Sequence, residues 1–145
     1  MSQGLEARRR DAYRHWNRLP TRWADNDAYG HVNNVAYYGW FDTVVNRWLI
    51  DHGLLDLGGG PIIGLVVETG CRYFAPLAFP QTIELGLRVS KLGSSSVRYD
   101  LGVFAENGFE AAAEGFFVHV YVDRGSRRPV QLPEAWRQQL SALLS

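Results

Sequence analysis

The stretch Arg22–Asp42, RWADNDAYGHVNNVAYYGWFD, contains the change of secondary structure that decides the fold of this chain. Its first residues predict a strand, Asp25 and Asp27 come before Gly30, and the chain then turns into an amphipathic helix. A carboxylate at such a junction lies beside a helix N-terminus, where unpaired N–H groups and the helix dipole favour negative charge. The junction therefore predicts a catalytic acid or base that faces an oxyanion site.

The helix after this junction is predicted to be long and rich in aromatic side chains. Its apolar residues recur at helical spacing after Asn33, and they are Val35, Tyr38, Phe41, Val45, Trp48 and Leu49. Gly53 is a typical C-cap, so the helix has roughly five turns at about 3.6 residues per turn. A surface helix does not need so many aromatic residues, and we therefore expect a curved layer to wrap this one.

Strand patterns lie on both sides of the helix in the sequence. Residues 13–23 predict a first strand, in which Pro20 removes a ladder donor and favours an edge or a bulge. Residues 62–74 are almost continuously apolar, which predicts a strand covered on both faces. Residues 83–89 and 97–103 alternate between apolar and other residues, the pattern of half-buried strands.

The last third of the chain predicts a meander that ends in a short helix. Asn107 and Gly108 favour a type I′ hairpin turn into a strand over residues 110–122, so the last three strands should be antiparallel neighbours. Pro133 marks the first turn of a C-terminal helix. The apolar stripe of this helix is expected to consist of Trp136, Leu140, Leu143 and Leu144. One long helix and about five antiparallel strands are an α+β layout in which the sheet buries an apolar face against the helix.

Length and composition predict one folded domain over residues 1–145, in which residues 1–10 are a mobile, charged lead-in. The formal net charge is zero, which argues against a nucleic-acid or membrane-surface partner. No apolar run follows the N-terminal arginines, so we expect neither a signal peptide nor a membrane span, and the default location is the cytoplasm. The single cysteine, Cys71, lies in a predicted buried strand and is expected to be a core residue rather than a nucleophile.

A motif in the opening stretch resembles the signature of a known family. The pattern D-x-D-x-x-G-H-V-N-N-x-x-Y is formed by Asp25, Asp27, Gly30, His31, Val32, Asn33, Asn34 and Tyr37. It is similar to the signature of the hotdog-fold acyl-CoA thioesterases, above all the 4-hydroxybenzoyl-CoA thioesterase-like family. The resemblance implies a five-stranded antiparallel sheet wrapped around one long helix. It also implies homodimers or homotetramers with a continuous sheet, active sites at the subunit interface, an acyl-CoA or acyl-carrier thioester as substrate, and no cofactor.

Asp27 is the first candidate for the chemistry, because the resemblance places the catalytic carboxylate at this second aspartate. Thioester hydrolysis needs a nucleophile and a group that stabilises the oxyanion. Asp27 can attack directly or activate a water, and backbone N–H groups around Asn33 and Asn34 can bind the oxyanion. The alternative is that Asp25 and Asp27 only form the turn and cap the helix.

The neighbouring residues of the motif have open roles. His31 is either a second acid or base, for which an ordinary pKa of about 6.5 is suited, or a residue that hydrogen-bonds the turn. The side chains of Asn33 and Asn34 either bind substrate or end the helix. Gly30 meets a backbone requirement, which is a positive φ or the close approach of a ligand.

Other candidates for substrate binding lie outside the motif. Tyr37 and its aromatic neighbours suit an apolar or aromatic acyl group. Glu68 interrupts an apolar run, and it either lines the pocket or pairs with an arginine such as Arg72. Coenzyme A carries phosphates that bind arginine or lysine. The candidates for these phosphates are Arg72, Arg88, Lys91 and Arg98, the turn that contains Ser94, Ser95 and Ser96, and the basic residues Arg124, Arg127 and Arg128.

Several other functions fit the sequence less well. A calcium loop that starts at Asp25 would have Tyr29 at its fifth position and Ala36 at its twelfth, where a glutamate is needed. The histidines are scattered, so no metal site is expected. A hotdog dehydratase would need the pattern D-x-N-x-x-H, in which Asp27 replaces the asparagine and His31 comes one residue too late. A non-catalytic acyl-CoA-binding hotdog protein remains the main alternative.

Overall fold

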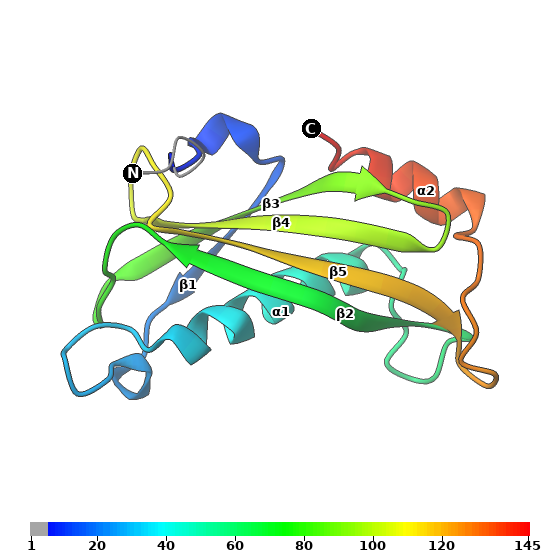
Figure 1. Cartoon of the computed structure of the whole chain (residues 1–145), viewed down its shortest axis with the longest axis horizontal. Helices are drawn as coiled ribbons and strands as arrows, with labels where there is room; N and C mark the ends of the chain where they lie inside the picture. Colours follow the sequence, from blue (N-terminus) through cyan, green and yellow to red (C-terminus); the bar gives the residue numbers. More distant parts are fainter. Residues whose placement is uncertain (1–5) are drawn as a thin grey trace.

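The computed structural model describes residues 6–145 and consists of one five-stranded sheet with a long helix against it (Figure 1). The strands are β1 (His15–Pro20), β2 (Ile62–Tyr73), β3 (Thr82–Leu92), β4 (Ser96–Ala105) and β5 (Ala113–Asp123). The helices are α1 (Asn34–Asp51) and α2 (Glu134–Ser141), and the 3-10 helices η1 (Arg10–Ala12) and η2 (Trp23–Asp25) are short. This architecture confirms the expected α+β layout.

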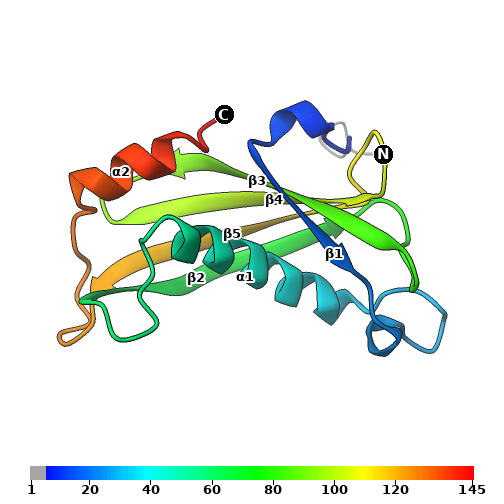
Figure 2. The ribbon, with the colours of Figure 1, turned by 180° about the vertical axis from the view of Figure 1, so that it is seen from behind.

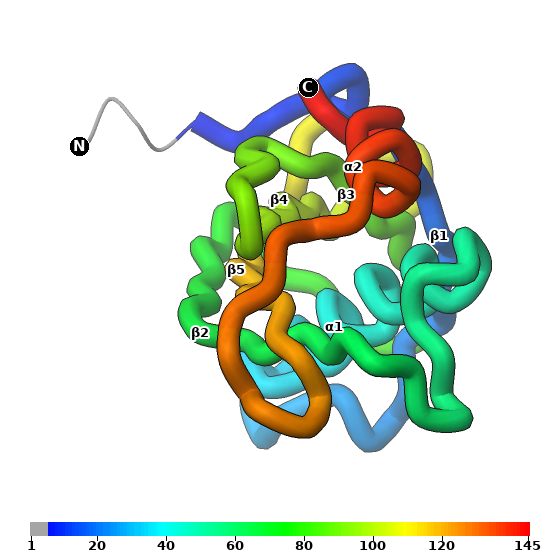
Figure 3. Tube along the Cα trace, turned by 90° about the vertical axis from the view of Figure 1, so that its right-hand side faces the viewer, coloured from blue at the N-terminus to red at the C-terminus, as the bar shows by residue number. Residues whose placement is uncertain are grey.

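The sheet is antiparallel throughout, with the strand order β1-β3-β4-β5-β2. From behind, α1 lies across its concave face (Figure 2), and seen from one end the strands form an arch around the helix (Figure 3). The hotdog fold is confirmed, as is the meander of β3, β4 and β5. Pro20 ends the edge strand β1, where a missing N–H donor is tolerated.

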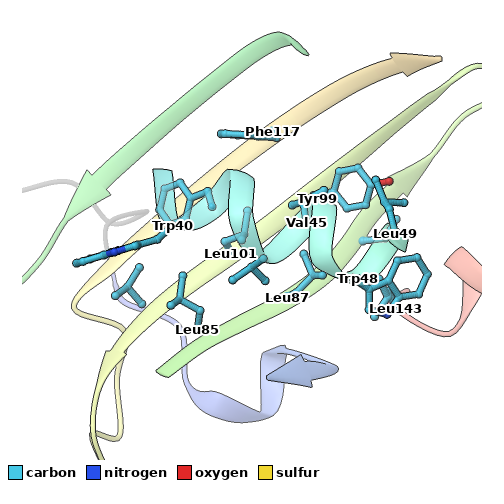
Figure 4. Close-up of a cluster of buried hydrophobic side chains, with 14 of the residues drawn as sticks. Trp40, Val45, Trp48, Leu49, Leu85, Leu87, Tyr99, Leu101, Phe117 and Leu143 are labelled. Atoms are coloured by element: carbon cyan, nitrogen blue, oxygen red, sulfur yellow. The ribbon is translucent and has the colours of Figure 1, made fainter. Parts of the chain in front are cut away.

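The core is formed where alternate residues of the central strands meet α1 (Figure 4). Ile83, Leu85, Leu87 and Val89 of β3 and Val97, Tyr99, Leu101 and Val103 of β4 are fully buried. They face a stripe of α1 that includes Phe41, Val45, Trp48 and Leu49. Burial of each such side chain lowers the free energy by about 1.5–3 kcal/mol. The face of the sheet that carries these apolar residues is therefore the face against which the helix packs.

The ends of α1 are set by local chemistry. The side-chain oxygen of Asn33 accepts a hydrogen bond of 2.9 Å from the N–H of Val35 and caps the first turn. The helix ends at Asp51, and Gly53, with φ of +73°, lets the chain turn away one residue after the cap residue His52. The predicted length of about five turns is correct for these 18 residues.

Two local predictions were wrong in the region before and after α1. The first strand, expected over residues 13–23, ends at Pro20, and Trp23 begins the 3-10 helix η2, in which the carboxylate of Asp25 accepts from the N–H of Arg22. Strand β2 is not covered on both faces. It is the outer strand beside β5, and most of its side chains are exposed, since α1 packs chiefly against β3 and β5.

Two details of the C-terminal half also differ from the expectation. The expected type I′ turn at Asn107 and Gly108 is wrong, because φ is positive at Asn107 (+62°) but not at Gly108; a longer loop leads to β5. In the C-terminal helix region Leu140 and Leu143 are buried, whereas Leu144 is 41% exposed and lies beyond the end of α2.

The expected lead-in over residues 1–10 lies partly outside the described residues, which begin at Glu6. From there on the chain contacts the outer face of the sheet. Arg8 pairs with Glu114, and Arg10 pairs with Glu84. The side chain of Tyr13 covers Gly86 and Gly102, where any Cβ would overlap its ring.

Candidate active site

The loop between η2 and α1 is a small hairpin turn. The N–H of Asp27 donates to the carbonyl of His31 at 2.8 Å, and the N–H of Gly30 donates to the carbonyl of Asp27 at 3.2 Å. Gly30 has φ of +82°, and a Cβ there would meet no atom within 4 Å. The glycine is therefore needed for its backbone conformation and not for space.

A second segment of the chain holds this loop in place. The N–H of Val32 donates to the carbonyl of Leu77 at 2.7 Å, and the N–H of Phe79 donates to the side-chain oxygen of Asn26 at 3.0 Å. Leu77 and Phe79 belong to the connection between β2 and β3. The loop is thus fixed against the end of the sheet at which α1 begins (Figure 1).

The two aspartates of the motif have different environments. Asp25 is 3% exposed, and its carboxylate accepts hydrogen bonds from the N–H and the guanidinium of Arg22 at 2.8 Å. Burial by itself would raise the pKa of Asp25, but the hydrogen bonds from Arg22 outweigh it and the pKa is lowered. Asp25 therefore shapes the turn, whereas Asp27 faces a cavity.

That cavity has a volume of about 560 Å³ and lies between the loop, the start of α1 and the end of β2. It is lined by Asp27, His31, Val32, Asn33, Asn34, Tyr37, Tyr73, Phe74, Ala75, Pro76 and Leu77. One carboxylate oxygen of Asp27 accepts from the N–H of Tyr29 at 2.8 Å and more weakly from that of His31 at 3.4 Å. The second oxygen binds no group among residues 6–145, so it is available to a water or a substrate.

Asn34, in the first turn of α1, lines the same cavity. Because the side chain of Asn33 caps Val35, it is already used in the helix. The N–H of Asn34, by contrast, has no acceptor within the described part of the chain. The hydroxyl of Tyr73 donates to the carbonyl of Asn34 at 3.4 Å and links β2 to this turn.

Aromatic rings form the wall that faces the loop. The ring of Tyr37 packs edge-to-face against Trp40 and Tyr73, each with centroids 5.0 Å apart. Burial raises the pKa of Tyr37 to about 12 and also raises that of Tyr73, so both hydroxyls stay protonated at neutral pH. This wall offers flat apolar surfaces and neutral hydroxyl groups.

The structure brings together one part of the predicted site. Asp27, His31, Asn33, Asn34 and Tyr37 all line this cavity. The imidazole of His31 is exposed and hydrogen-bonds no group of the described chain. Only the backbone of His31 takes part in the turn: its carbonyl accepts from the N–H of Asp27, and its N–H donates to the carboxylate of Asp27.

Other predicted binding residues lie elsewhere in the protomer. Glu68 is exposed on β2, next to a bulge at Val67, and forms no ion pair within residues 6–145. Arg88 points to the outer face of the sheet and binds Asp100 at 3.1 Å. Lys91 and Ser95 lie near the turn between β3 and β4, at the end of the sheet away from Asp27 (Figure 1).

The remaining phosphate candidates are also distributed over the surface. Arg72 and Arg98 line a separate hollow of about 200 Å³ on the outer face. In that hollow Arg98 binds the buried carboxylate of Asp100 at 3.1 Å and packs over Phe116. The basic residues Arg124, Arg127 and Arg128 follow β5.

Cys71 is half-buried, and burial raises the pKa of its thiol to about 11. A thiol with such a pKa is mostly protonated at neutral pH, which does not suit a nucleophile. Among residues 6–145 no group of three histidine, cysteine, aspartate or glutamate side chains is arranged to hold a metal ion. None of the helices in this part of the chain is long and apolar enough to cross a membrane.

Sequence reasoning missed Tyr73 and the segment Phe74–Leu77 as parts of the site. Tyr73 ends a strand that was expected to be buried, and no local signal places its ring beside α1. These residues come to the cavity because β2 runs antiparallel to β5 and ends where α1 begins.

Known proteins resemble this chain in sequence and in fold. The model of the thioesterase-like superfamily matches residues 21–140. The structure of the PA5185 protein from Pseudomonas aeruginosa is 57% identical, with a TM-score of 0.91 over 96% of this chain and 97% of that one. A comparison with curated proteins finds no match.

Two more distant structures share the fold. The 1,4-dihydroxy-2-naphthoyl-CoA thioesterase Slr0204 from Synechocystis is 17% identical, with a TM-score of 0.78 over 87% of this chain and 94% of that one. The DHNA-CoA thioesterase from Staphylococcus aureus is 21% identical, with a TM-score of 0.77 over 87% of each chain.

Proposed function

Because the chain belongs to the thioesterase-like superfamily and is a thioester hydrolase, we propose that it hydrolyses an acyl-CoA thioester with Asp27 as the catalytic carboxylate. The observation that carries this proposal is the shared cavity of Asp27 and the first turn of α1. The carboxylate of Asp27 has one oxygen without a hydrogen bond in the described chain, and the N–H of Asn34 has no acceptor there.

The proposed reaction uses both groups. Asp27 takes a proton from a water whose oxygen attacks the thioester carbon, or its own carboxylate attacks and forms an anhydride that water then cleaves. The negative charge that develops on the carbonyl oxygen is stabilised by the N–H of Asn34 and the positive end of the α1 dipole. When the carbon–sulfur bond breaks, the thiolate of coenzyme A leaves and takes up a proton.

The acyl group is proposed to be apolar or aromatic. Tyr37, Tyr73 and Phe74 surround the cavity with aromatic rings, and such rings favour apolar and flat partners. Two structures with the same fold, from Synechocystis and Staphylococcus aureus, are named as thioesterases of 1,4-dihydroxy-2-naphthoyl-CoA and DHNA-CoA, thioesters of an aromatic acid.

The active assembly is proposed to be a homodimer formed through β2. Leu65, Val66 and Val67 of this strand are 36%, 48% and 60% exposed, and the outer edge of β2 has no partner strand within residues 6–145. An exposed apolar edge strand is a template for pairing with another strand. A second copy that pairs its own β2 here would continue the sheet and place its residues near Tyr73.

The test is thiol release from short-chain, long-chain and aromatic acyl-CoAs by the wild type, Asp27→Asn and Asp51→Asn. Asp51→Asn removes an exposed carboxylate at the far end of α1 and serves as the control. We expect Asp27→Asn to lose at least about 100-fold in kcat, the scale of a positioned acid or base, with the circular dichroism spectrum unchanged. A folded Asp27→Asn that keeps its turnover would contradict the role of Asp27.

A further inference from the structure

A second cavity adjoins the site of Asp27. It has a volume of about 660 Å³ and lies between the N-terminal segment, the loop after β4 and the connection after β2. Its wall is mostly apolar and is formed by Ala7, Arg9, Phe74, Ala75, Pro76, Leu77, Ala105, Phe109, Glu110, Ala111 and Ala112.

The two cavities have a common wall. Phe74, Ala75, Pro76 and Leu77 line both of them, so they lie on either side of this one short segment. A ligand that is longer than its reacting end can therefore reach from the Asp27 cavity over the segment into the second one. Thioesters of coenzyme A have this shape, since a long arm joins the thioester to a nucleotide.

Phe109 makes the second cavity suitable for a planar ring. It is 87% exposed, although a phenyl ring in water gives up the free energy of burial. Five alanines and Pro76, which have small side chains, also line this cavity. An adenine base stacks on an aromatic side chain in such a setting.

Arg9 supplies a charge at the same wall. Of the three consecutive arginines, Arg8 pairs with Glu114 and Arg10 with Glu84, whereas Arg9 is exposed and forms no ion pair within residues 6–145. Glu110 lies opposite Arg9 in the backbone pairing and also lines the cavity. An anionic ligand would thus be attracted by Arg9 and repelled by Glu110.

We propose that this second cavity binds the nucleotide end of the coenzyme A thioester, with adenine against Phe109 and a phosphate at Arg9. The inference rests on the function proposed above, because it takes the substrate from there. It places the nucleotide away from the residues that the sequence had suggested for the phosphates, among them Arg88 and Lys91.

The test is calorimetric titration with coenzyme A, dephospho-coenzyme A and pantetheine. We expect Phe109→Ala to weaken the binding of coenzyme A about tenfold, within the range known for stacking of a base, and to leave that of pantetheine unchanged. Arg9→Ala should weaken the two nucleotide ligands but not pantetheine, and Glu110→Gln should strengthen them. Arg47→Ala, which changes an exposed arginine on α1, is the control and should bind as the wild type does.

These binding measurements test the nucleotide site separately from the proposed hydrolytic activity. If Phe109→Ala and Arg9→Ala bind coenzyme A as the wild type does, the nucleotide site is wrong, even where Asp27→Asn abolishes hydrolysis. If both variants bind it more weakly while no thioester is hydrolysed, the nucleotide site stands and the proposed activity fails. Weaker binding of a free long-chain fatty acid by Phe109→Ala, with coenzyme A unaffected, would assign the cavity to the acyl chain and overturn the proposal.

Discussion

The ring of Phe41 in α1 lies directly on the backbone of Gly115 in β5. A Cβ at Gly115 would stand 2.6 Å from Cζ of the ring, closer than such atoms approach in real structures. Phe41 is fully buried and packs edge-to-face against Phe117, so its ring has no free space to move into. This contact limits how closely α1 can approach the sheet.

Gly115→Ala should therefore destabilise the protein by about 1–3 kcal/mol, the usual cost of overpacking a core. The same substitution at Gly39 is the matched control, because a Cβ there meets nothing within 4 Å and alanine favours the helix. Gly39→Ala should be neutral or stabilising by up to about 1 kcal/mol. Urea unfolding of both variants measures the difference, and equal stabilities would show that Phe41 can move aside.

Asn33→Ala should cost about 1 kcal/mol of stability, because it removes the side-chain cap of α1. Asn33→Ser keeps a capping oxygen and should recover most of this loss. Urea unfolding and thiol release measured on both variants compare stability with activity. If Asn33→Ser is as unstable as Asn33→Ala, the cap is not what Asn33 contributes.

His119 should make the stability depend on pH in the acid range. It is 4% exposed, its Nε2 has no hydrogen-bond partner in the described chain, and burial lowers its pKa to about 4 from an ordinary 6.5. Between pH 4 and pH 6.5 the unfolded chain binds a proton at His119 that the folded chain does not bind. Stability contributed by the neutral imidazole is therefore present above pH 6.5 and is lost as the pH falls towards 4.

The measurement is the free energy of unfolding of the wild type, His119→Gln and Tyr121→Phe at several values between pH 4 and 7. His119→Gln should flatten the slope by up to about 1.4 kcal/mol per pH unit. Tyr121→Phe removes the hydroxyl 3.3 Å from the ring of His119 but keeps the imidazole, and should retain the slope. An unchanged slope in His119→Gln would mean that other groups cause the acid sensitivity.

Val66→Lys should weaken the proposed dimer, because a lysine on an edge strand opposes pairing with a second strand. Leu57→Lys, on the 82% exposed loop position before β2, is the matched control. Sedimentation velocity should show a dimer for the wild type and Leu57→Lys, and more monomer for Val66→Lys. A wild type that is monomeric at all concentrations would rule out the dimer.

The sequence by itself determined the fold class and the central part of the site. Period-two alternation placed the inner residues of β3 and β4, helical spacing placed α1, and the motif from Asp25 to Tyr37 pointed to Asp27 at the start of that helix. These features are local, since they depend on residues a few positions apart. Local sequence therefore carries them without knowledge of the rest of the chain.

Tertiary structure alone decided which partners reach that site. Whether β2 is covered depends on the strand order, and apolar residues cannot reveal whether they face a core or a second subunit. Tyr73 and Phe74–Leu77 enter the cavity only through the pairing of β2 with β5 across some fifty residues of sequence. Arg88 lies away from the cavity because its side chain points to the outer face, a direction set by the register of β3 with β4, and Lys91 lies away from it because it is at the other end of β3.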